Sequence, residues 1–257
     1  LLSFVLAQVI GNNLPLPVTA IMYRVGTSWF FILIYLLILF LLLELIRVTG
    51  LFPVTRFMYR SWLGFGTLVG MLTLVLTWGY IVYLNKARVT LSLTVNKEMK
   101  AQGSLKIVAI SDLHLGYGIG KKEFESWIEL INKENPDIVL IAGDAIDNSV
   151  RPLYEQGIAE LFKQINARYG VYASPGNHEY IAGISKSLAF LKEAGVTVLR
   201  DSVALINNAF YVAGRDDRTN ATRKSVKELT DTLDKSKLLI LLDHQPFQLE
   251  QAERNGI

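Results

Sequence analysis

The chain has 257 residues, a formal net charge of +3 and no cysteine. Without cysteine it has no disulfides, thiolate metal sites or cysteine nucleophiles, and its length fits either one large domain or two ordinary ones. The small net charge offers no basic surface of the kind that binds nucleic acid, so we expect no nucleic-acid partner.

Charged residues are distributed unevenly along the chain. It has 26 basic and 23 acidic residues in total, but only five of these precede residue 85: Arg24, Glu44, Arg47, Arg56 and Arg60. These five account for the whole net charge, and the rest of the chain is balanced. We therefore predict transmembrane helices over residues 1–84 and a water-exposed region after them.

Two transmembrane helices are predicted, near residues 25–46 and 61–84. The first contains an uncharged run over 25–43, which is long enough to cross a hydrocarbon core of about 30 Å as a helix. The second has tryptophan and tyrosine toward its ends, where such rings favour the membrane interface. Residues 1–10 resemble the tail of an earlier span. The chain is thus predicted to be a multi-pass membrane protein.

The basic residues near these spans bear on orientation. Arg47, Arg56 and Arg60 lie between the two predicted helices, which favours a cytoplasmic loop and an extracytoplasmic domain after it. Lys86 and Arg88, directly after the second helix, favour the opposite orientation. Both orientations stay open, with a lean toward the extracytoplasmic one.

Residues 85–104 are predicted to be a juxtamembrane linker with an extended strand at 89–95. After them, apolar runs of strand length alternate with helical periodicity. Strands are predicted at 105–110, 137–142, 170–174 and 237–242, with shorter ones at 196–199, 203–206 and 210–214. Helices are predicted at 121–135, 152–166, 185–194 and 225–233. This order indicates an α/β domain with some antiparallel content.

A polar motif follows each of the four longer strands. The motifs are Asp112-Leu113-His114, Gly143-Asp144-Ala145-Ile146-Asp147, Gly176-Asn177-His178-Glu179 and Asp243-His244. Open α/β sheets bind ligands beyond the carboxyl ends of their strands, so these motifs are expected to meet in one site. Taken singly, each is more typical of a turn or a cap. Their conjunction, which uses all three histidines of the chain, favours a metal site.

In this order the motifs resemble those of the calcineurin-like metallophosphoesterase family, over residues 105–246. The preceding helices resemble the membrane-anchored bacterial branch of that family. The resemblance implies an α/β fold of two β-sheets in a sandwich flanked by helices. It also implies hydrolysis of phosphoric esters or pyrophosphates with two divalent metal ions.

By motif position, the resemblance assigns five metal ligands. Asp112 and His114 would bind one ion, Asn177 and His244 the other, and Asp144 would bridge both. Carboxylate, amide and imidazole ligands together suit Mn²⁺, Fe²⁺ or Zn²⁺. Two such ions can clamp a phosphoryl group and activate water.

Two further residues would act on the substrate. The resemblance implies that His178 donates a hydrogen bond or a proton to the phosphoryl or leaving oxygen, and that Asp147 orients it. A charged loop at Gly214-Arg215-Asp216-Asp217-Arg218 is either a phosphate contact or a solvated turn, and both alternatives stay open.

The family's closing Gly-His-x-His motif does not follow His244, which lies thirteen residues before the last residue. We interpret residues 105–257 as a C-terminally truncated domain, and a degraded site is the alternative. Two functions are therefore weighed. One is a membrane-anchored hydrolase acting on a phosphorylated small molecule or a lipid-linked phosphate, and the other is a non-catalytic membrane sensor or binding protein.

Overall fold

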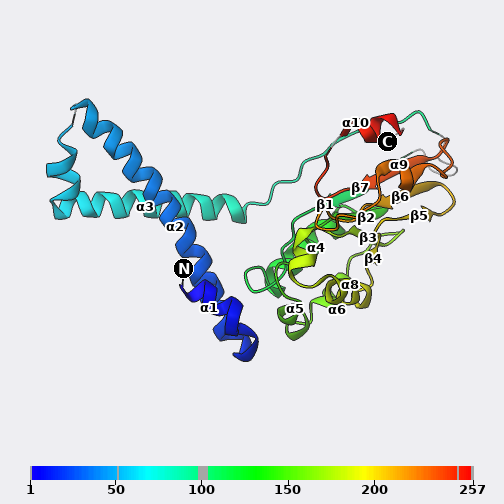
Figure 1. Cartoon of the computed structure of the whole chain (residues 1–257), viewed down its shortest axis with the longest axis horizontal. Coiled ribbons are helices and arrows are strands. Elements are labelled where there is room, and N and C mark those ends of the chain that lie inside the picture. Colours follow the sequence, from blue (N-terminus) through cyan, green and yellow to red (C-terminus); the bar gives the residue numbers. More distant parts are fainter. Residues whose placement is uncertain (1, 51, 98–103, 248, 256–257) are drawn as a thin grey trace. The chain divides into compact units, whose positions relative to one another are not determined.

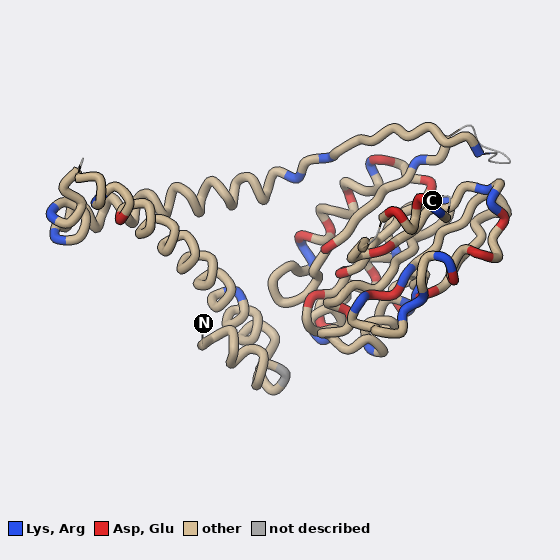
Figure 2. Tube along the Cα trace, turned by 45° about the horizontal axis from the view of Figure 1, so that its top comes forward, with Lys and Arg blue, Asp and Glu red and all other residues tan. Residues whose placement is uncertain are grey.

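The computed structural model describes residues 2–50, 52–97, 104–247 and 249–255. It divides into two compact units, residues 1–93 and 94–257, which are described separately here. Figure 1 shows helices alone in the first unit and both sheets in the second. Charged side chains are sparse along the helices of the first unit and frequent, in both signs, over the second (Figure 2).

The first unit contains the helices α1 (Leu2–Ile10), α2 (Leu16–Thr49) and α3 (Trp62–Leu84). Both α2 and α3 are long and apolar enough to cross a membrane, and almost none of their most apolar stretches is buried in the structure. Helix α2 extends beyond the predicted 25–46 at both ends. Prolines at its start and Gly50 at its end, in a left-handed conformation with φ 69°, explain these limits.

Close packing joins α1 to α2. A side chain at Gly26 of α2 would overlap the backbone of Phe4 in α1, so glycine permits this approach. The short 3₁₀ helix η1 (Gly11–Asn13) connects the two, and Thr19 Oγ1 donates a hydrogen bond of 2.9 Å to the carbonyl of Gly11. A five-residue π-helical segment, η2 (Thr55–Tyr59), lies between α2 and α3.

The strand predicted at residues 89–95 does not form. These residues have no regular secondary structure and pair with none of the strands that the structure describes. Their alternating apolar side chains are exposed, with Val89 at 90% and Leu91 at 76%. Alternation alone predicted a strand here, but a strand also needs a neighbour that supplies hydrogen bonds.

The second unit is built on two sheets. The first sheet is parallel, in the order β1 (Ile107–Ile110), β2 (Ile138–Ala142), β3 (Val171–Ser174) and β4 (Thr197–Val198). The second contains β5 (Ser202–Ile206), β6 (Phe210–Gly214) and β7 (Leu238–Leu242). Strand β6 pairs antiparallel with β5 and parallel with β7.

Strand β2 lies at the centre of the sandwich and buries both faces. Val139 and Ile141 pack in one apolar core with Phe124, Phe162 and other residues of the covering helices. Their neighbours Ile138 and Leu140 point the other way, into a core shared with the second sheet. This alternation explains why β2 is apolar throughout.

Helices cover the outer face of the first sheet (Figure 1). They are α4 (Lys121–Lys133), α5 (Arg151–Glu155), α6 (Ile158–Phe162) and α8 (Ile184–Glu193). The single helix predicted at 152–166 is wrong, because Gly157 with φ 69° separates α5 from α6. Short helices α7 (Asn177–Ile181), α9 (Val226–Thr230) and α10 (Leu249–Arg254) complete the unit. The predicted α/β sandwich of two sheets flanked by helices is confirmed.

Candidate active site

The site lies where the strands of both sheets end. Strands β1, β2 and β3 are parallel, so the motifs that follow them leave the sheet at the same edge. Strand β7 of the second sheet brings His244 to this edge, where Nδ1 of its ring lies 2.8 Å from the carbonyl oxygen of Ala142 at the end of β2. The predicted meeting of the four motifs is therefore present.

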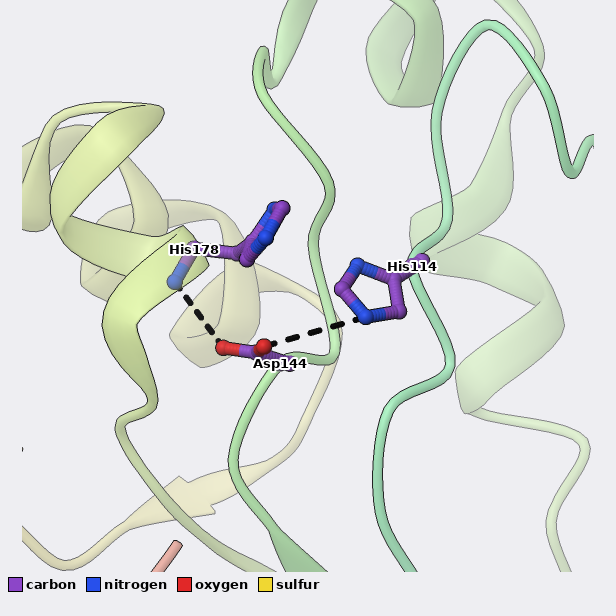
Figure 3. A group of neighbouring side chains, drawn as sticks. All are labelled: His114, Asp144 and His178. Carbon is purple, nitrogen blue, oxygen red and sulfur yellow. Dashed lines mark hydrogen bonds and ion pairs between the residues drawn. The ribbon is translucent and has the colours of Figure 1, made fainter. Parts of the chain in front are cut away.

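Asp144 is the centre of the site and is only 3% exposed. Its Oδ2 lies 3.2 Å from Nε2 of His244 and 3.7 Å from Nε2 of His114, and its Oδ1 accepts a 2.9 Å hydrogen bond from the backbone N–H of His178. Figure 3 shows one end of this carboxylate facing the His178 backbone and the other facing the His114 ring, with the two imidazole rings side by side.

Asp144 belongs to two overlapping groups of metal-ligating side chains. One consists of His114, Asp144 and His178, and the other of Asp112, Asp144 and His244; within each, the ligand atoms lie within 4.8 Å of one another. A carboxylate shared by two groups is the geometry that a bridging ligand requires. Imidazole and carboxylate ligands in this arrangement fit borderline divalent cations.

The backbone at the site is strained. Asp112, His114 and Asp144 have φ of 56°, 46° and 53°, in the left-handed region that costs a non-glycine residue about 1 kcal/mol or more. The N–H of Asp112 donates to the carbonyl of Gly143, and that of His114 to the carbonyl of Asp144. These bonds hold the first two motifs against each other and aim their side chains at a common point.

Two glycines leave room for the site. A β-carbon at Gly143, whose φ is 81°, would overlap the ring of His244, and one at Gly176 would overlap Oδ1 of Asp144. Any larger residue at either position would displace these side chains. The glycines of the two motifs thus allow His244 and the backbone to pack closely around Asp144.

His178 lies in one of the two groups rather than apart from them, and Asp147 holds its ring. Nδ1 of His178 is 3.0 Å from the carbonyl oxygen of Asp147 and 3.2 Å from its Oδ1. A carbonyl oxygen only accepts, so this contact places a proton on Nδ1. The centroids of the His114 and His178 rings are 4.4 Å apart.

Asn177 is the first residue of α7, and its Oδ1 accepts a 2.8 Å hydrogen bond from Nε2 of Gln245. Gln245 was not among the residues that the sequence analysis selected. Its place directly after His244 was the only signal in the sequence. It links the third motif to the fourth.

Glu179 was quoted in its motif but given no role, and the structure supplies one. Its carboxylate is 1% exposed and accepts hydrogen bonds from the backbone N–H groups of Asp144, Ile146 and Gly176, at 3.0, 2.9 and 2.6 Å. Burial raises the pKa of this carboxyl. Glu179 thereby holds the Asp144 loop to the turn that carries Asn177 and His178.

Neighbouring carboxylates favour the protonated forms of His114 and His244. The hydrogen bond with Asp144 raises the pKa of His244 to about 9, and the one with Asp147 raises the pKa of His114. Burial acts to raise the pKa of Asp144, but hydrogen bonds with His244 and the His178 backbone outweigh it and hold the pKa below its ordinary value. The carboxylates of the site thus stabilise positive charge on the neighbouring rings, and a bound cation would displace these protons.

Residues 105–255 match the family described as calcineurin-like phosphoesterase. The chain belongs to this family. It is 35% identical to an uncharacterized metallophosphoesterase of Aquifex aeolicus over 60% of this chain and 60% of that protein. It is 29% identical to the zebrafish (Danio rerio) transmembrane protein with metallophosphoesterase domain, over 71% of this chain and 46% of that protein.

A third relative, the uncharacterized metallophosphoesterase YkuE of Bacillus subtilis, is 30% identical over 71% of this chain and 66% of its own length. The chain thus spans about half to two thirds of the length of these three relatives. The chain therefore has a metallophosphoesterase domain with candidate metal ligands, and apolar helices that could span a membrane precede this domain.

Proposed function

We propose that the protein is a membrane-anchored, metal-dependent hydrolase that cleaves phosphoric ester or pyrophosphate bonds. The observation that carries this proposal is Asp144, a buried carboxylate shared by two groups of metal-ligating side chains. By motif position, Asp112 and His114 would hold one cation, Asn177 and His244 the other, and Asp144 would bridge them. The two groups in the structure divide these side chains differently, with His178 beside His114 and Asp112 beside His244, but Oδ1 of Asp112 also lies 3.6 Å from Nε2 of His114. Mn²⁺, Fe²⁺ and Zn²⁺ all suit this set.

When bound, two such cations supply Lewis acidity, which lowers the pKa of water and offsets charge on the phosphoryl group. The protein's own residues do the rest. The carbonyl oxygen of Asp147 accepts a hydrogen bond from Nδ1–H of His178 and so fixes the ring. His178 can then hold a proton at Nε2 for the leaving oxygen, a role that contributes roughly 10² to 10⁴-fold in rate. The side chain of Asp112 is 53% exposed to solvent.

We further propose that a phosphorylated small molecule or a lipid-linked phosphate is the substrate. The two apolar helices support the second alternative, because they would hold the site near a bilayer. With two spans, the protein would be multi-pass. If the loop that carries the arginines at 47, 56 and 60 is cytoplasmic, the phosphoesterase domain would be extracytoplasmic.

The test uses the full-length protein in detergent, stripped of metal with a chelator and then supplied with Mn²⁺, Fe²⁺ or Zn²⁺. We expect two ions per protein and hydrolysis of chromogenic phosphate mono- or diesters that depends on them. Turnover that survives complete metal removal would contradict the proposal. Tight binding of two ions without turnover on any ester or pyrophosphate would favour a binding or sensing role.

The lipid-linked substrate has its own test. Rates on a detergent-dispersed lipid phosphate and on a short soluble ester with the same scissile bond are compared. A higher kcat/KM for the lipid supports the membrane role, and equal values count against it.

A further inference from the structure

A loop of buried charges lies beside the site. Residues 215–224 follow β6, and we call them the charged loop. Arg215 is 9% exposed, and Asp216 and Asp217 are 1% exposed each. Charges at this depth are costly unless other charges and hydrogen bonds satisfy them, so their partners indicate what they do.

At one end, the charged loop clamps Asp243. Nη1 of Arg215 donates to Oδ2 of Asp243 at 3.1 Å, and Nη1 of Arg223 donates to Oδ1 at 3.2 Å. All three side chains are about one tenth exposed. Each carboxylate oxygen is thus held by a different arginine, and the next residue after this clamped aspartate is His244.

At the other end, the charged loop holds α7. Oδ2 of Asp216 accepts hydrogen bonds from the hydroxyl of Tyr180 at 2.7 Å and from Nε of Arg200 at 2.8 Å. Tyr180 is the second residue after His178 in α7. Nη1 of Arg223 also donates to the carbonyl oxygen of Asp216 at 3.0 Å, which joins the two ends of this network.

These contacts decide between the two alternatives for Arg215. Arg215 is not a solvated turn residue, and its guanidinium is already engaged, since its Nε also donates to the carbonyl of Lys224 at 2.8 Å. Contact with a substrate phosphate would require Arg215 or Arg223 to release the buried Asp243 carboxylate. Arg215 and Arg223 therefore hold protein groups, whereas Arg218 of the same loop is exposed and lies 3.7 Å from the ring centroid of Phe247.

We propose that Asp243 is a positioning residue for His244, and that the charged loop braces His244 against α7 through Arg215, Arg223, Asp216 and Tyr180. The brace joins the second sheet, which supplies His244, to the helix that supplies Asn177 and His178. This inference rests on the proposed two-metal function. Groups that orient metal ligands typically contribute about 10 to 100-fold to metal affinity.

The experiment titrates metal-free protein in detergent with Mn²⁺ and follows the free ion by electron paramagnetic resonance. Asp243→Asn preserves size, but its amide has one acceptor oxygen and turns an N–H toward an arginine. We expect the affinity for one of two ions to fall about 10 to 100-fold, with the other unchanged. The control is Asp234→Asn, an exposed aspartate before β7 that bonds Lys237, and it should bind both ions as wild type.

If Asp243→Asn shows no cooperative thermal transition, and so does not fold, the same titration is done with Arg215→Lys. Lysine keeps the positive charge but cannot reach both Asp243 and the Lys224 carbonyl. The same selective loss supports the inference. Unchanged affinities, or an equal loss of both ions in a folded variant, overturn it. Wild-type protein that binds no Mn²⁺ would overturn the proposed function and this inference together, so the two failures are distinguishable.

Discussion

Nε2 of His244 lies 3.2 Å from Oδ2 of Asp144, and these two residues come from different sheets. Asp144 follows β2 of the first sheet, and His244 follows β7 of the second. The contact exists only when the two sheets pack face to face, which Ile138 and Leu140 of β2 achieve by burial against the second sheet. The stability of the sandwich and the geometry of the site are therefore coupled.

Asp144→Asn should abolish the shared site. The amide keeps one acceptor oxygen and loses the charge that faces His114 and His244, so we expect metal affinity and metal-dependent kcat/KM to fall by about 100-fold or more. Metal content and hydrolysis of a chromogenic diester measure this. Asp137→Asn, at the opposite end of β2, is the control and should retain both. Undiminished turnover in Asp144→Asn would remove the bridging role.

His178→Gln should separate proton donation from metal binding. If His178 supplies a proton to the leaving oxygen, kcat should fall about 10² to 10⁴-fold for an alkyl ester and much less for a nitrophenyl ester, whose leaving group needs no proton. Both substrates are assayed on the same preparation with Mn²⁺ binding recorded. Loss of a bound ion would instead make His178 a metal ligand, as its place beside His114 and Asp144 also permits.

Gly143→Ala and Gly157→Ala form a matched pair. Both glycines have positive φ, so each substitution should cost about 1 to 2 kcal/mol of folding free energy from backbone strain. A β-carbon at Gly157 meets nothing within 4 Å, whereas one at Gly143 would overlap His244. We expect only Gly143→Ala to lose metal affinity in a Mn²⁺ titration, and equal affinities would show that the site tolerates the displacement.

Glu179→Gln should destabilise the domain by about 1 to 3 kcal/mol, because the amide N–H₂ would face backbone N–H groups that now donate to a carboxylate. Thermal unfolding of the detergent-solubilised protein measures this. Glu160→Gln is the control, since this side chain is 72% exposed and pairs with Lys163 at the surface. Equal melting temperatures for the two variants would argue against a holding role for Glu179.

Asp216→Asn should show a pH-dependent loss of stability. Burial opposes ionisation, but hydrogen bonds from Arg200 and Tyr180 hold the pKa of Asp216 below its ordinary value. Because the pKa of Asp216 is lower in the folded protein than in the unfolded chain, its ionisation stabilises the fold at pH values above the unfolded pKa of about 3.9. This contribution to the unfolding free energy is lost as the pH falls through the folded pKa. The wild-type advantage in unfolding free energy should thus be largest near neutral pH and shrink below about pH 4. A constant difference would exclude Asp216 as its source.

The strands that carry the site were predictable because each is an apolar run of strand length that ends at a turn-forming residue. Strand β2 was expected at 137–142 and is found at Ile138–Ala142, and Asp144 follows it as expected. Local sequence patterns failed where secondary structure depends on a neighbouring strand or on the backbone conformation of one residue. The 89–95 segment has alternation without a neighbouring strand, and Gly157 breaks a helix whose periodicity continues across it.

Local periodicity and turn chemistry were enough to predict the fold class, the apolar helices, and the order of the motifs that bring Asp144 and the three histidines to strand ends. Three contacts could be found in the folded protein alone: Glu179 accepts hydrogen bonds from three backbone N–H groups, Gln245 bonds Asn177, and Arg215 clamps Asp243 instead of facing solvent. The physical reason is that a polar side chain takes whichever partners long-range packing buries beside it, and spacing along the chain does not specify them.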